Sequence, residues 1–95
     1  MIVGTCLIQL HLPGNGSLKG KRSLLKPLLT RLHQEFNVSA AEVGHQDAWQ
    51  TAEIALALVS NDASHVQTVL QRAVGWIEVN RPDVQIVDYT IEVIS

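Results

Sequence analysis

The sequence lacks most of the features that mark disulfide-stabilised, membrane-spanning or exported proteins. Cys6 is its only cysteine, which excludes a disulfide within the chain. No stretch approaches the roughly 20 apolar residues that a membrane-spanning helix needs. Residues 1–12 are apolar but alternate like a strand and carry no basic leader. We therefore expect no signal peptide and a cytoplasmic protein.

Residues that hold metals or cofactors are equally scarce. The four histidines (His11, His33, His45 and His65) do not have the spacing of metal ligands, and Cys6 alternates with expected core residues. No motif points to a cofactor or to a reaction. The sequence thus favours a protein that binds neither metal nor cofactor and is not an enzyme.

Acidic residues are absent from the first third of the chain. Residues 1–34 contain five of the seven Lys and Arg residues and no Asp or Glu, whereas residues 35–95 contain all nine acids. This asymmetry suggests a charged partner for one face, although a short chain can also reach it by chance. With 95 residues, 46% of them hydrophobic and 17% charged, the chain is long enough for a single globular domain, residues 1–95.

The basic residues coincide with the densest leucine pattern, in residues 17–36. As one helix, this segment places its leucines and Phe36 on a narrow apolar arc facing a core. Lys19, Arg22 and Lys26 form a stripe along one flank of that arc. Pro27 predicts a kink. The alternative is a separate turn followed by a helix that begins near Ser23, and we favour one kinked helix.

Strand patterns occupy residues 2–12, 38–44, 49–60 and 84–94, and Asp62 is placed to cap a second helix that ends at Asn80. Strands 38–44 and 49–60 are expected to form a hairpin. The register that we favour places these residues on the core side: Ser39, Ala41, Val43, Ala52, Ile54 and Leu56. Glu42 then faces solvent with Thr51 and Glu53.

This order of elements predicts an α+β, ferredoxin-like βαββαβ fold, with a four-stranded antiparallel sheet and both helices on one face. Strands 2–12 and 49–60 are expected in the centre. In the last strand, Val87, Tyr89, Ile91 and Val93 are expected to face inward. The expected buried set is Ile8, Leu10, Leu28, Leu32, Ile54, Leu56, Leu70, Val74, Tyr89 and Ile91.

Three segments resemble a family of small bacterial proteins, the YlxP-like family (domain of unknown function 503). They are SLKGKR at residues 17–22, NVSAAEVGHQDAWQ at residues 37–50 and Asp88-Tyr89. The resemblance extends over essentially the whole chain. The family often has Glu at the position of Gly20 and Asp at that of Gly44, so this chain lacks two of its acids. The resemblance implies a ferredoxin-like fold and genes beside those of translation and ribosome-maturation factors, and it supplies no catalytic residue.

Three places are candidate sites. The basic helix is the candidate nucleic-acid site, through Lys19, Lys21, Arg22 and Lys26. The turn before it offers Gly14, Gly16 and Ser17 to an anion at a helix N-terminus, as in the acylphosphatase cradle on the same fold, but it matches no phosphate-loop signature. The loop with His45, Asp47 and Trp49 suits a partner; a general acid–base pair there lacks a nucleophile, and a purely structural turn is the simpler interpretation.

The uncovered sheet face is expected to carry four acids (Glu42, Glu53, Asp88 and Glu92) and no aromatic on its central strands, which excludes base stacking on the sheet. Three functions remain. The first is a translation accessory module that docks on ribosomal RNA or a ribonucleoprotein through the basic helix. The second is a homo-oligomeric interaction module that uses the uncovered face, where Val3, Leu7, Ala55, Ala57 and Val59 are expected. The third is a small enzyme acting at Gly14–Ser17 or at the His45–Asp47 loop.

Overall fold

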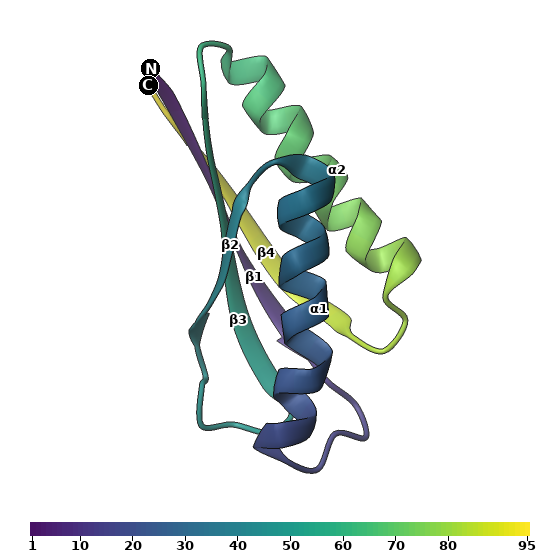
Figure 1. Cartoon of the computed structure of the whole chain (residues 1–95). Helices are drawn as coiled ribbons and strands as arrows, with labels where there is room; N and C mark the ends of the chain where they lie inside the picture. The colour runs from purple at the N-terminus through teal and green to yellow at the C-terminus, as the bar shows by residue number, and fades with distance from the viewer.

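Six elements follow one another in the order β-α-β-β-α-β in the computed structural model, which describes residues 1–95 (Figure 1). They are β1 (Ile2–His11), α1 (Leu18–Phe36), β2 (Ser39–Gly44), β3 (Thr51–Ser60), α2 (Ala63–Asn80) and β4 (Gln85–Ile94). The sheet order is β2-β3-β1-β4, and every neighbouring pair is antiparallel. The predicted ferredoxin-like fold is confirmed. Neither helix is long and apolar enough to cross a membrane.

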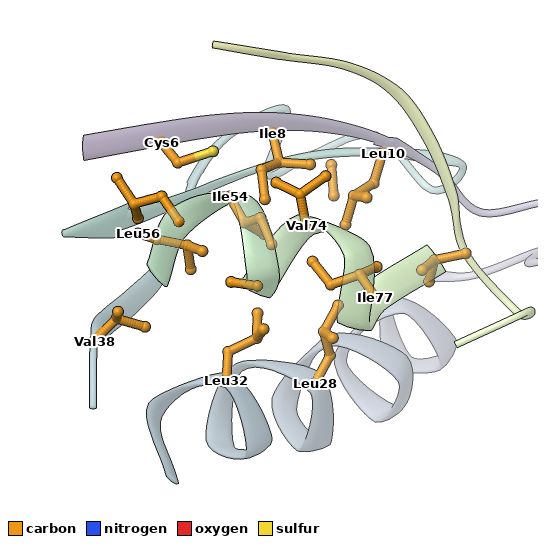
Figure 2. Packing of buried hydrophobic residues seen from close by; sticks show 14 of the residues in the cluster. Cys6, Ile8, Leu10, Leu28, Leu32, Val38, Ile54, Leu56, Val74 and Ile77 are labelled. Carbon is orange, nitrogen blue, oxygen red and sulfur yellow. The ribbon is translucent and has the colours of Figure 1, made fainter. Parts of the chain in front are cut away.

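The core lies between the sheet and the two helices (Figure 2). Side chains at alternate positions of the central strands point into it, such as Ile8 and Ile54, because successive residues of a strand face opposite sides. Leu28 and Leu32 of α1 and Ile77 of α2 meet them from the other side (Figure 2). Residues three and four apart share one helix face, so the leucine spacing alone predicts this contact.

The edge strand β4 is less buried than predicted. Tyr89 is 43% exposed and Ile91 is only half-buried, because β4 has a neighbour on one side only. A bulge opposite Gln9 and Leu10 shifts the alternation, and Val87 becomes 68% exposed. The predicted inward position of Val87 is therefore wrong. Tyr89 lies on the predicted core side, since it pairs with the buried Ile8, but its predicted burial is wrong. The other buried positions of β1, β3 and both helices are confirmed.

Helix α1 is continuous across Pro27, as favoured over two separate segments. Ser17 caps it, since its Oγ accepts a hydrogen bond of 2.9 Å from the N–H of Gly20. Asn37 ends it in the left-handed conformation, with φ 52°. The prediction of one helix is confirmed.

The β2–β3 register differs from the predicted one by an odd number of residues, so that the two faces of β2 are exchanged. Ala40 pairs with Leu56 and Glu42 pairs with Ile54, so Glu42 faces the helices and Val43 faces outward. A shift of one residue reverses the two faces of a strand. A second bulge, between Glu42 and Gly44, accompanies this arrangement.

Candidate functional site

A buried lysine is the most unusual feature of the molecule. Lys21, in the first turns of α1, is 2% exposed, although it belongs to the basic segment. Its Nζ donates hydrogen bonds to the carbonyl oxygens of His45, at 2.6 Å, and Ala48, at 2.9 Å. It also lies 2.8 Å from Oε2 of Glu42. Two carbonyl oxygens and one carboxylate oxygen thus surround the ammonium group, the first two as hydrogen-bond acceptors and the third as its counter-charge.

Lys21 explains why the hairpin register differs from the expected one. Glu42 Oε2 is buried and makes no hydrogen bond of regular geometry, so the nearby ammonium charge compensates its loss of water. Facing solvent, Glu42 would leave Lys21 without a counter-charge. The assignment of Lys21 to a nucleic-acid surface is wrong, because its charged end is inside the protein.

The loop between β2 and β3 is fixed at several backbone carbonyls. Besides the two contacts of Lys21, the side-chain amide of Asn15 donates to the carbonyl of Trp49, at 2.6 Å. The backbone N–H of Leu12 donates to the carbonyl of Gln50, at 2.8 Å, and the Gln50 side chain donates back to the carbonyl of Asn15, at 3.1 Å. The loop and the turn before α1 therefore form one hydrogen-bonded unit.

The side chains of this loop point outward while its backbone is held. His45, Gln46, Asp47 and Trp49 are exposed, and the Trp49 side chain is 56% exposed. No hydrogen bond joins His45 to Asp47, so the geometry gives no support to an acid–base pair. The loop instead exposes four side chains on a backbone that is held in place.

The turn predicted to bind an anion serves α1 directly. Ser17 Oγ caps the helix, and Asn15 donates a second hydrogen bond, of 2.9 Å, to the Ser17 carbonyl. Gly14 has φ 77°, a conformation that favours glycine. Gly16 is exposed beside it. Anion binding here stays a prediction.

The stripe on the outer face of α1 consists of Lys19, Arg22 and Lys26. All three are exposed, and none has an acidic group within ion-pair distance. Arg22 and Lys26 line a shallow depression together with Ser23, Pro27, Thr30 and Arg31. Arg31 belongs to the packing of the helices, since it pairs with Glu35 at 3.0 Å and lies 5.5 Å from the ring centre of Trp76.

Groups suited to covalent or metal chemistry do not come together. Cys6 is fully buried, and burial raises the pKa of its thiol to about 11, so little thiolate forms at neutral pH. No group of three or more His, Cys, Asp or Glu side chains gathers in a metal-binding arrangement. The two features left for recognition are the α1 stripe and the loop that Lys21 holds.

The sheet order and the two helices on one face define a ferredoxin-like α+β domain, and its comparison with known proteins identifies the family. The model of the family described as "Protein of unknown function (DUF503)" matches residues 3–91, and the chain belongs to this family. The uncharacterized protein YlxP of Bacillus subtilis (strain 168) is 44% identical over 63 residues, which are 66% of this chain and 68% of that protein.

Solved structures agree on the fold alone, since their sequence identities are low. A de novo designed protein with ferredoxin fold superposes with a TM-score of 0.57 at 11% identity, over 99% of this chain and 84% of the other. The acylphosphatase from Bacillus subtilis gives a TM-score of 0.53 at 15% identity, over 99% and 86% of the two chains. The structured domain of Drosophila melanogaster Boca gives 0.52 at 14% identity, over 93% and 95%.

Sequence reasoning missed the role of Lys21, although a signal was present. Residues 18, 21, 25, 28 and 32 follow one helical stripe, with a lysine at its second position. Its position on this stripe, and not its charge, places Lys21 on the inner face of α1. The part played by Asn15 had no comparable signal, because it depends on two loops that are distant in sequence.

Proposed function

We propose that this protein is a non-catalytic accessory module of the bacterial translation apparatus that docks on RNA or a ribonucleoprotein through the outer face of α1. The supporting observation is the stripe formed by Lys19, Arg22 and Lys26, three exposed cations without an acidic partner. The resemblance to the YlxP-like family also implies genes beside those of translation and ribosome-maturation factors, which is the reason for proposing an RNA or ribonucleoprotein partner.

The charge distribution favours this face over the uncovered sheet. Glu53, Asp88 and Glu92 lie on the uncovered side, opposite or beside β1, and would repel phosphate. On the outer face of α1, cations at spacings of three and four residues follow the helix like a line of phosphate contacts. Three such contacts give weak, salt-sensitive binding, with a slope of log affinity against log salt of roughly −2 to −3.

Charge reversal tests the proposal. The triple variant Lys19→Glu, Arg22→Glu and Lys26→Glu is expected to lose co-sedimentation with bacterial ribosomal subunits at low salt while its circular dichroism is unchanged, since all three side chains are exposed. Arg72→Glu on α2 is the matched control and is expected to bind like the parent. Binding of the triple variant at parental strength across a salt series would refute the proposal.

A second function has its own support in the uncovered sheet face, which is more apolar than the sequence suggests because Glu42 has left it. Leu7 is 43% and Val59 is 65% exposed there. Such a surface suits self-association. If the protein dimerises through this face, Leu7→Glu with Val59→Glu converts the dimer to a monomer in sedimentation analysis. Val79→Glu on α2 leaves the dimer intact. A parent that stays monomeric at high concentration removes this candidate.

A further inference from the structure

The loop of residues 45–50 is held more firmly than a connection between two strands requires. Lys21 is buried to bind two of its carbonyl oxygens, and Asn15 binds a third. An apolar side chain in place of Lys21 would avoid the desolvation penalty of a buried ammonium and its carboxylate partner. The lysine therefore fixes the loop backbone through hydrogen bonds that an apolar side chain cannot make.

The fixed loop presents a large aromatic side chain to solvent. Trp49 is 56% exposed, while its own carbonyl is bound by Asn15. Trp76, the other tryptophan, packs edge-on against Phe36. An exposed indole on an anchored backbone loses little backbone entropy on binding, and exposed tryptophans are enriched at binding hot spots.

Trp49 lies at the end of the molecule where the α1 stripe begins. The side chain of Asn15 bridges the carbonyl of Trp49 and that of Ser17, the cap of α1. Lys19 is the second residue of the helix. Figure 1 shows the β2–β3 connection and the N-terminal end of α1 at the same end of the molecule. A single flexible chain of nucleic acid can thus contact both Trp49 and the α1 stripe.

We propose that Trp49 is a stacking platform for an unpaired base of single-stranded RNA whose phosphates follow the α1 stripe. This inference rests on the proposed function and names its ligand class. Stacking on aromatic side chains is the usual way in which unpaired bases are bound. Gln46 and Asp47 are exposed and make no side-chain hydrogen bond within the protein, so an amide and a carboxylate are free for the edge of the stacked base. The carboxylate repels phosphate and accepts from the amino groups of cytosine or guanine.

The test compares single-stranded RNA with an RNA duplex of the same sequence at low salt. Trp49→Ala is expected to lower the affinity for the single strand about 5- to 150-fold and to leave the affinity for the duplex unchanged. Trp49→Phe, the matched control, retains most of the single-strand affinity. In a Trp76→Phe background, where Trp49 is the only tryptophan, the single strand quenches the fluorescence and the duplex does not.

The positioning role of Lys21 has a separate readout. The double variant Lys21→Met with Glu42→Gln removes the buried ammonium charge and the charge of its partly buried carboxylate partner. In the Trp76→Phe background, we expect it to remain folded by circular dichroism, with lower fluorescence anisotropy at Trp49 and weaker single-strand binding. Unchanged anisotropy and affinity would contradict this role of the lysine.

The outcomes separate the two proposals. If Trp49→Ala binds the single strand like the parent while the triple charge reversal does not, the stacking platform is wrong and docking through α1 stands. If the parent binds neither RNA nor ribosomal subunits, both proposals fail. If Trp49→Ala loses a protein partner but no RNA, the loop binds protein and the stacking platform is refuted.

Discussion

The two helices cover the same face of the sheet, yet their sequences differ in kind. Helix α2 has a regular apolar stripe, from Val66 to Ile77, and Arg72 is its only Lys or Arg. Helix α1 has an equivalent stripe but adds a buried lysine, an internal proline and a row of exposed cations. In α2, packing explains the apolar stripe, and the exposed residues form no row of cations. In α1 it explains the leucines and leaves Lys19, Arg22 and Lys26 without a structural role.

The surplus charge on one of two otherwise similar helices is the reason for placing the proposed RNA contact on α1. The first turn of α1 also holds the β2–β3 loop through Lys21. Under the proposed function, α1 combines RNA contact with folding, whereas α2 has no comparable row of exposed cations. This difference can be probed by substitutions at equivalent positions of the two helices.

The largest expected effect tests whether the two apolar stripes are equivalent. Leu32 in α1 and Leu70 in α2 are both fully buried. Leu32→Ala and Leu70→Ala are each expected to lower the free energy of unfolding by roughly 2–5 kcal/mol, measured by urea denaturation. A loss below about 1 kcal/mol at Leu32 would show that α1 contributes less to the core than α2.

Pro27 gives the second test, because α2 has no internal proline. Proline has no N–H to donate to the carbonyl of Ser23 and crowds it. Pro27→Ala is expected to raise the free energy of unfolding by about 2 kcal/mol, the gain in the helix being partly offset by a more flexible unfolded chain. A clear loss of stability in urea denaturation would show that the helix depends on the proline, against its interpretation as a strained position.

The smallest effect concerns Arg81, which connects the C-terminal end of α2 to α1. Arg81, the C-cap of α2, donates to the carbonyl of Leu24 in α1, at 2.9 Å, and pairs with Asp83 at 2.7 Å. The hydrogen bond from Arg81 holds the pKa of Asp83 below its usual 3.8. The folded state therefore gains stability from this carboxylate above pH 3.8 and loses it as the pH falls through the lowered pKa.

Asp83→Asn is expected to lower stability at neutral pH by about 0.5 kcal/mol or less, since the carboxylate is partly exposed. Thermal unfolding at a series of pH values checks the sign: parent and variant converge under acidic conditions. Glu78→Gln, at an exposed position of α2 without an ion pair, is the control. A difference that grows as the pH falls would contradict the assigned direction of the pKa shift.

The sequence by itself determined the element order, the helix caps at Ser17 and Asp62 and the core stripes of both helices. These follow from local rules, because the alternation of a strand and the spacing of a helix are properties of neighbouring residues. The row of cations formed by Lys19, Arg22 and Lys26 could be recognised from the same helical spacing.

Only the tertiary structure decided the register of β2, the burial of Lys21 and the anchoring of the loop that carries Trp49. Each depends on partners distant in sequence. Lys21 meets Glu42 and the carbonyls of His45 and Ala48, and Asn15 reaches Trp49 across 34 positions. Its charge alone predicted that Lys21 lies on the surface. Three oxygens brought within reach by the fold placed it inside, because together they replace the water that a buried ammonium group loses.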